Sequence, residues 1–177
     1  MITATIDLPS LYREIPELRG DLRSDHAGES GAVQIYRGIL TLTRDPAIRA
    51  FATEHLATEQ EHLRLLEAIG AERSLLLPVW KVAGFLTGFL PALFGPRAVY
   101  ATIEAVETFV DHHYAEQIAR LDGGPLRALL VECQHDEVHH RDEAAAALGA
   151  ERGLFLRLWG WVVTFGSASA VAAARRF

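Results

Sequence analysis

Two short stretches, Glu59-Gln60-Glu61-His62 and Glu137-Val138-His139-His140, each place a glutamate three positions before a histidine. A further glutamate precedes each stretch, and the interval from Glu29 to Glu59 equals the interval from Glu107 to Glu137. The pattern Glu…Glu-x-x-His therefore occurs twice, and each member of the second copy follows its counterpart in the first by one constant offset. Side chains at positions i and i+3 share one face of a helix, so each glutamate–histidine pair can contribute to a single site.

The surrounding sequence predicts that all four parts of this pattern lie on helices. Apolar residues recur at steps of three and four beside each of them, which indicates amphipathic helices with the glutamates on the inner face. The first helix is expected to start near Ser24 or Asp25, the second at Asp45-Pro46, the third at Gly95-Pro96, and the fourth after Gly123-Gly124-Pro125. The second is expected to end near Ile69, the third around Gly123-Gly124-Pro125 and the fourth near Gly149.

The composition fits one all-α domain with a buried core, here assigned to residues 21–177, after an arm of residues 1–20 that Pro9, Pro16 and Gly20 interrupt. A net charge of −6 argues against a nucleic-acid partner. Cys133 is the only cysteine, which excludes internal disulfides and fits a reducing compartment. The N-terminus lacks the pattern of a signal peptide.

Two apolar segments lie outside the four predicted helices. Residues 75–95 carry one charge, Lys81, and are interrupted by prolines and glycines, so we expect a hairpin or short helix that faces a membrane surface. Residues 154–177 are expected to form a fifth, apolar helix with large aromatic residues. We expect it to pack on the bundle with one face toward lipid, because its glycines and serines weaken the case for a membrane span.

A four-helix bundle can bring the two Glu-x-x-His pairs together with the two single glutamates around two metal ions, as in the ferritin-like carboxylate proteins. Four carboxylates would offset the charge of two divalent ions, and imidazole with carboxylate ligands favours iron or manganese. We expect Glu59 and Glu137 to bridge the two metals. The remaining ligands would be Glu29 and His62 on one metal and Glu107 and His140 on the other.

Several other residues are weaker candidates for this site. His113, with His112, and Tyr114 are possible partners of the ligands, although Tyr114 is more typical of a core position. Asp111 and Asp142 are candidates to orient the imidazoles, and Glu104 is an alternative to Glu107. We expect His55 and His139 to be structural and Cys133 to be a small core residue.

The motifs resemble those of the demethoxyubiquinone hydroxylases, di-iron monooxygenases of ubiquinone synthesis. The resemblance covers about residues 20–177. It rests on Asp25-His26-Ala27-Gly28-Glu29, on both Glu-x-x-His pairs, on Leu77-Pro78-Val79-Trp80 and on His112-His113-Tyr114. The chain departs from the family pattern at Thr108, where a second glutamate is usual, and in His139-His140-Arg141-Asp142, where Glu-His-His-Asp is usual. Neither departure removes a ligand, but both leave the substrate and the electron source more open.

The resemblance implies that two iron ions and O2 hydroxylate the ring of a polyprenyl demethoxyquinol, with NAD(P)H or the quinol itself as the electron source. It also implies peripheral contact with the cytoplasmic face of the cell membrane, and a second copy of the chain or an accessory lipid-binding protein as further partners. Two alternatives remain: a ferroxidase or peroxide-scavenging di-iron protein of the same fold, and a non-enzymatic bundle that binds lipid or protein. The sequence contains no Gly-x-Gly-x-x-Gly stretch, so it does not indicate a built-in dinucleotide-binding fold.

Overall fold

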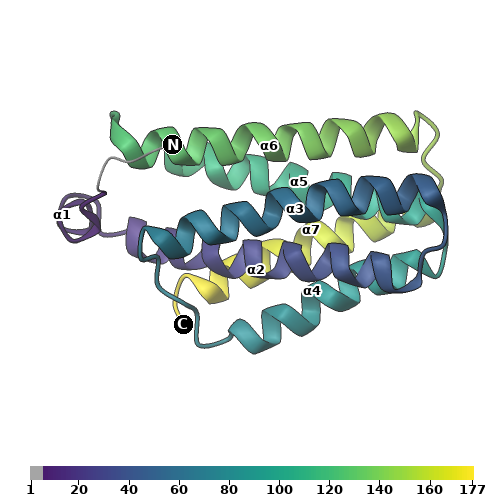
Figure 1. The fold of residues 1–177 in the computed structure, drawn as a ribbon, viewed down its shortest axis with the longest axis horizontal. Helices are drawn as coiled ribbons and strands as arrows, with labels where there is room; N and C mark the ends of the chain where they lie inside the picture. The colour runs from purple at the N-terminus through teal and green to yellow at the C-terminus, as the bar shows by residue number, and fades with distance from the viewer. Residues whose placement is uncertain (1–5) are drawn as a thin grey trace.

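A computed structural model describes residues 6–177. The described residues form seven helices and no β-strand, which confirms the all-α prediction (Figure 1). The helices are α1 (Leu8–Glu14), α2 (Leu18–Leu42), α3 (Pro46–Ala68), α4 (Leu77–Ala92), α5 (Pro96–Ile118), α6 (Gly124–Leu148) and α7 (Leu154–Ala174).

The four-helix bundle consists of α2, α3, α5 and α6. Helix α2 packs along α3, and α5 packs along α6, with further contacts between α2 and α5 and between α3 and α6. The single glutamates Glu29 and Glu107 lie on α2 and α5, whereas the two Glu-x-x-His pairs lie on α3 and α6. Each helix of the bundle therefore contributes one part of the repeated pattern.

Most predicted helix boundaries are confirmed. The Asp45 carboxylate accepts hydrogen bonds from the backbone N–H groups of Ala47 and Ile48, at 2.8 and 3.3 Å, and so caps α3 where the sequence predicts a start. Helix α6 ends at Leu148, directly before Gly149, whose φ of 77° suits glycine. Helix α5 ends at Ile118, earlier than the predicted end near Gly123.

The predicted start of α2 is wrong. The helix begins at Leu18, not at Ser24 or Asp25, and the predicted arm contains the short helix α1. Ser24 and Asp25 are buried within α2 instead of capping it, and the Ser24 hydroxyl donates to the Asp21 carbonyl at 2.7 Å. The early turns form because Leu18 and Leu22 are fully buried in the core.

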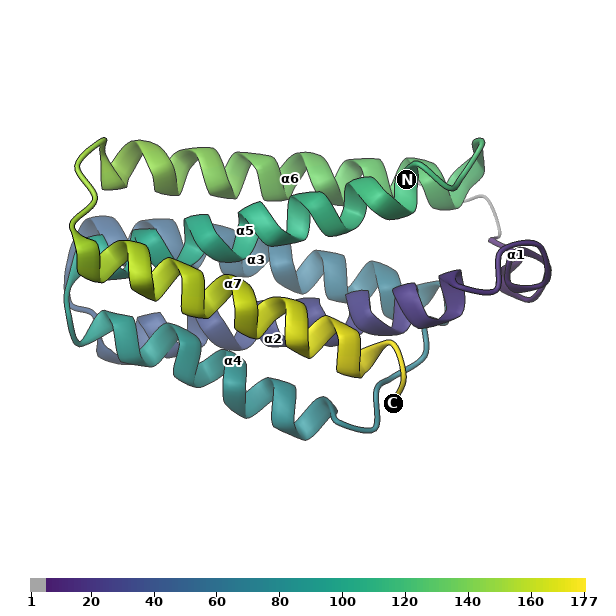
Figure 2. The ribbon, with the colours of Figure 1, turned by 180° about the vertical axis from the view of Figure 1, so that it is seen from behind.

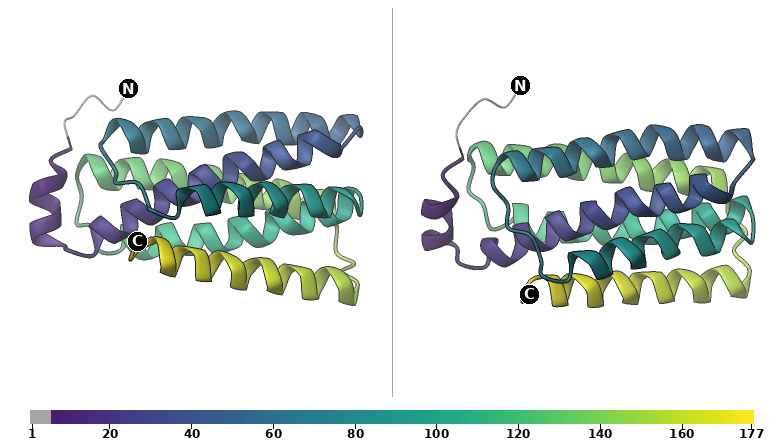
Figure 3. Two further views of the ribbon diagram at one scale, coloured as in Figure 1. Left: turned by 90° about the horizontal axis from the view of Figure 1, so that it is seen from below. Right: turned by 60° about the horizontal axis from the view of Figure 1, so that its bottom comes forward.

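Helices α4 and α7 cover the α2–α5 side of the bundle, opposite α3 and α6 (Figures 2 and 3). The segment 75–95 is thus one short helix and not a hairpin. Glycines allow α4 to lie very close to α2: a Cβ atom at Gly88 would stand 1.9 Å from the carbonyl oxygen of Ile35, and one at Gly84 would stand 2.4 Å from that of Gly31. This contact fixes α4 along α2.

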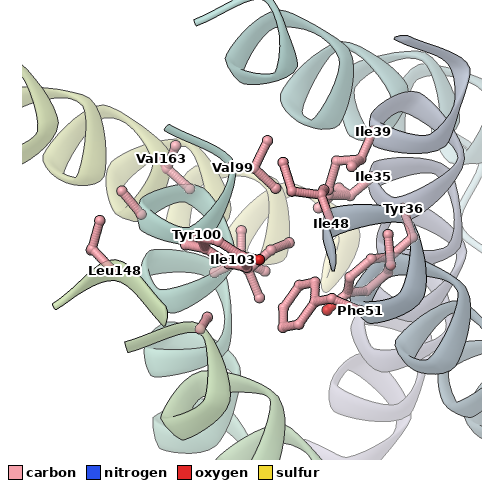
Figure 4. Close-up of a cluster of buried hydrophobic side chains, with 14 residues drawn as sticks. Ile35, Tyr36, Ile39, Ile48, Phe51, Val99, Tyr100, Ile103, Leu148 and Val163 are labelled. Carbon is pink, nitrogen blue, oxygen red and sulfur yellow. The ribbon is translucent and has the colours of Figure 1, made fainter. Parts of the chain in front are cut away.

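Two hydrophobic clusters fill the bundle at different levels. Figure 4 shows the cluster in which Tyr36 from α2 and Phe51 from α3 lie near Ile103 from α5. The second cluster contains Leu22 and Tyr114, together with residues of α6. Along each bundle helix, the metal-ligand candidates fall between members of the two clusters, so an apolar shell surrounds the polar centre on both sides.

Candidate metal centre

The structure brings the six predicted ligands together in the middle of the bundle, and each is at most 4% exposed. Their ligand atoms form two groups, within each of which the atoms lie within 4.8 Å of one another. One group contains Glu29, Glu59, His62 and Glu137, and the other contains Glu59, Glu107, Glu137 and His140. Glu59 and Glu137 belong to both groups, which is the arrangement expected of bridging ligands.

Both histidines direct Nδ1 toward the carboxylates. His62 Nδ1 lies 3.1 Å from Glu137 Oε1 and 3.7 Å from Glu29 Oε2. His140 Nδ1 lies 3.1 Å from Glu59 Oε1 and 3.4 Å from Glu137 Oε2. His140 therefore points between the two bridging candidates, whereas His62 points between Glu137 and Glu29.

Burial and mutual repulsion control protonation at this centre. Burial, with the negative charge of Glu137, raises the pKa of both Glu59 and Glu107 well above the usual value of a glutamate. Burial lowers the pKa of His62 and His140, but the surrounding carboxylates, Glu137 foremost, together outweigh burial and raise both pKa values. Burial likewise opposes ionisation of Glu137, but the adjacent imidazoles of His140 and His62 lower its pKa to about 2.

The donor set fits two divalent cations. Among the described residues, both oxygens of Glu59, one oxygen of Glu137 and Nδ1 of His140 are buried without a hydrogen-bond partner. Buried polar atoms of this kind are costly unless a proton or a metal satisfies them. Four carboxylates and two imidazoles would neutralise two divalent ions and suit iron or manganese.

Two tyrosines contact the single glutamates from across the bundle. The Tyr36 hydroxyl donates to Glu107 Oε1 at 3.3 Å, and the Tyr114 hydroxyl donates to Glu29 Oε1 at 2.5 Å. The sequence indicated Tyr114 as a candidate but not Tyr36. The repeat could have identified Tyr36, because Tyr36 and Tyr114 are separated by the same offset as Glu29 and Glu107.

Asp136 is a second residue that the sequence-based prediction missed. Its Oδ2 lies 3.1 Å from His62 Nε2, the imidazole nitrogen that faces away from the carboxylates. A carboxylate in this position fixes the tautomer and the orientation of a ligand histidine. The counterpart of Asp136 in the first copy of the repeat is Thr58, so the repeat predicts no equivalent carboxylate for His140.

The other candidates lie away from the six ligands. His113 Nε2 lies 3.0 Å from Asp25 Oδ1, and the hydrogen-bond partners of His113 within residues 6–177 include no ligand candidate. Asp111 and Asp142 both pair with Arg141 and do not orient an imidazole. Glu104 pairs with Arg152 at 2.5 Å, so it does not replace Glu107. Cys133 is buried in the core, as expected.

A cavity of about 450 Å³ reaches the centre from the side that α4 and α7 cover. All four ligand glutamates lie on its wall: Glu29, Glu59, Glu107 and Glu137. Small residues of the covering helices, among them Gly84, Gly166 and Ala170, line the rest together with apolar residues of α5. Ser24, Asp25 and His113 add a polar edge. A cavity of this size and polarity is typical of a site for a small organic molecule.

Comparison with known proteins agrees with this architecture. Residues 16–174 match the family model described as "Ubiquinone biosynthesis protein COQ7". The chain is 40% identical, over 68% of its length and 60% of the relative's, to a protein of Rhodospirillum rubrum named 3-demethoxyubiquinol 3-hydroxylase. It is 31% identical, over 88% of its length and 76% of the relative's, to a protein of Rattus norvegicus named NADPH-dependent 3-demethoxyubiquinone 3-hydroxylase, mitochondrial. A Caenorhabditis elegans protein with that name is 28% identical over 88% of each chain. The chain belongs to the COQ7 family of ubiquinone-biosynthesis proteins.

Proposed function

We propose that the chain is a di-iron monooxygenase that uses O2 to hydroxylate the ring of a polyprenyl demethoxyquinol. The observation that carries the proposal is the contact between the two parts of the site: the cavity wall includes four glutamates of the metal centre. A molecule held in this cavity would lie directly beside the metals. The names of the relatives supply the substrate class, and the name of the rat relative supplies NADPH as the electron source.

Each residue of the centre has a defined part in this proposal. Glu59 and Glu137 would bridge two irons, with Glu29 and His62 on one and Glu107 and His140 on the other. When bound, the two irons supply the reduction of O2 and the transfer of one oxygen atom to the ring, with the other released as water. Tyr36, Tyr114 and Asp136 hold the outer ligands in place through hydrogen bonds.

The cavity would position the quinol and exclude water. Its apolar wall of α4, α5 and α7 residues suits the ring and the first part of the polyprenyl tail. The polar edge formed by Ser24, Asp25 and His113 offers hydrogen-bond partners for the quinol hydroxyls. His113 is held by Asp25 and Gln117, so its ring has a fixed orientation for this contact.

The outer face of α4 and α7 supports peripheral contact with a membrane surface, which we propose is the cytoplasmic face. Large apolar side chains are exposed along both helices, including Val82 at 62%, Trp161 at 66% and Phe165 at 62%. Within residues 6–177, α7 alone is long and apolar enough to cross a membrane, judged by length and composition. Because α7 packs lengthwise on α5 and α2, we favour a bundle that lies on the membrane and takes its substrate from it.

The test begins with anaerobic loading of ferrous iron into the purified chain and a count of iron atoms per chain. Oxygen, NADPH and a short-tailed demethoxyquinol are then added, and the product is identified by mass spectrometry. We expect two irons and a product that carries one additional oxygen atom. The Glu59→Gln variant removes a bridging charge with little change in shape, so it should keep its helicity but lose iron and turnover.

Two other results would contradict the proposal. Two irons that oxidise while the quinol stays unchanged would favour a ferroxidase or peroxide scavenger of the same fold. A chain that binds no iron but retains its affinity for vesicles after Glu59→Gln would favour a non-enzymatic lipid-binding bundle.

A further inference from the structure

A second cluster of metal-ligating side chains lies beside the proposed di-iron centre, on the side of His140. It consists of His55 from α3 with His139 and Glu143 from α6, and the three offer ligand atoms within 4.8 Å of one another. His55 Nε2 lies 2.8 Å from Glu143 Oε2, and His139 Nε2 lies 3.9 Å from the same oxygen. We propose that His55, His139 and Glu143 bind a third divalent metal ion of the zinc type, separate from the two irons.

His55 is the buried member of this cluster. Its Nε2 lies 2.8 Å from Glu143 Oε2, and its Nδ1 lies 3.4 Å from the Tyr36 hydroxyl. Neutral imidazole and carboxylate both have lone pairs, so a divalent metal ion can replace the hydrogen bond between His55 and Glu143.

The geometry of the cluster suits a tetrahedral ion. Zinc bonds of about 2.0–2.1 Å place neighbouring ligand atoms about 3.3 Å apart. The two separations from Glu143 Oε2, 2.8 and 3.9 Å, lie on either side of this value. His55 is 1% exposed and stacks on His140 with ring centroids 4.0 Å apart, so its position is fixed. The side chains of His139 and Glu143 are 63% and 41% exposed and can rotate to meet the ion.

The ligand types indicate the class of metal. Two imidazoles and one carboxylate form a set that zinc accepts readily, with water in the remaining position. His139 and Glu143 stand at positions i and i+4 of α6, so one helical face presents both. Their exposure gives the ion direct access from solvent, unlike the buried centre.

The experiment uses the full chain loaded anaerobically with two equivalents of ferrous iron. Zinc ions are then added, excess metal is removed, and both metals are counted by mass spectrometry of the elements. We expect two irons and one zinc per chain. The variants His139→Ala and Glu143→Gln should keep both irons but bind zinc more weakly by about tenfold or more. Loss of a residue that only orients a metal ligand lowers metal affinity by about 10–100-fold, and loss of the ligand itself should lower it at least as much.

The control is His112→Ala, which removes an exposed histidine outside the cluster and should leave the zinc count unchanged. Equal zinc binding by the wild type and both cluster variants would overturn the inference. So would zinc uptake that occurs only with an equal loss of iron. The iron count before zinc is added tests the proposed function, whereas the dependence of zinc binding on His139 tests the third site, so the two failures are distinct.

Discussion

Tyr36 and Tyr114 cross the bundle in opposite directions, each donating a hydrogen bond to the single glutamate on the other's helix. Tyr36 on α2 reaches Glu107 on α5, and Tyr114 on α5 reaches Glu29 on α2. The two tyrosines share the sequence offset of the ligands. The repeat thus includes the residues that hold the ligands as well as the ligands themselves, and the centre is built from two similar halves.

The two halves differ at the histidines, and this difference can be measured. Asp136 holds His62 at 3.1 Å, whereas the corresponding position for His140 is Thr58. We expect Asp136→Asn to weaken iron binding at the His62 half by about 10–100-fold, because the amide no longer fixes the imidazole through a charged hydrogen bond. A titration with ferrous iron should then show one tight and one weak site.

Asp142→Asn is the matched control for this substitution. Asp142 lies on the same helix and pairs with Arg141, and within residues 6–177 it forms no ion pair with a ligand candidate, so both irons should bind as in the wild type. Equal weakening of iron binding in Asp136→Asn and Asp142→Asn would show that charge near the bundle, and not the orientation of His62, controls affinity.

The residues of the metal centre should make the metal-free chain less stable as pH rises. The pKa values of Glu59 and Glu107 are raised above 4.5, and those of His62 and His140 are raised above 6.5, so the folded state holds protons that the unfolded state loses. The carboxyl groups therefore reduce stability as pH rises above about 4.5, and the stability from the histidines is lost above about 6.5. The lowered pKa of Glu137, about 2, acts only at pH values below this window.

The measurement is the thermal unfolding midpoint between pH 5 and 8, with a chelator and with bound ferrous iron under anaerobic conditions. Bound metal replaces the protons, so the iron-loaded chain should gain more stability at pH 8 than at pH 5, and iron binding should release protons. The double variant Glu59→Gln/Glu107→Gln should remove much of the pH dependence of the metal-free chain. A double variant that keeps the full pH dependence of the metal-free chain would contradict this account.

The repeat in the sequence predicted the bundle and the positions of the six candidate ligands, because helical spacing fixes which residues share a face. It did not predict their partners. Asp136 contacts His62 across two helices, and that contact depends on how α3 and α6 are rotated and shifted relative to each other. Nor did it predict the contact of His55 with Glu143, because the two residues are 88 positions apart in sequence.

The start of α2 shows a second limit of the sequence. Ser24 and Asp25 have the chemistry of helix caps, but the structure uses them inside the helix, where Asp25 pairs with His113. Capping preference is worth about 1 kcal/mol, and burial of Leu18 and Leu22 outweighs it, since each buried leucine contributes about 1.5–3 kcal/mol. Tertiary packing that forms only in the folded chain thus decided this boundary.

The proposed substrate cavity can be tested by filling it. Ala170 on α7 lines the cavity, so we expect Ala170→Phe to raise the KM for the quinol by about tenfold or more, or to abolish turnover, while two irons still bind. Ala172→Phe is the matched control, since Ala172 lies on the same helix but is exposed and outside the cavity lining. Unchanged kinetics in Ala170→Phe would exclude this cavity as the quinol site.

The exposed aromatic residues of α7 should provide a large part of any membrane affinity. Trp161 and Phe165 are 66% and 62% exposed, with ring centroids 5.7 Å apart, and transfer of one such side chain from water to an apolar phase is worth about 1.5–3 kcal/mol. We therefore expect Trp161→Glu and Phe165→Glu each to weaken binding to phosphatidylcholine–phosphatidylglycerol vesicles by about tenfold or more, as measured by flotation.

Val131→Glu places the same charge on α6, the opposite side of the bundle, and should leave binding unchanged. If Val131→Glu weakened binding as much as the α7 substitutions, added negative charge alone would explain the effect. The face formed by α4 and α7 would then not be the membrane contact.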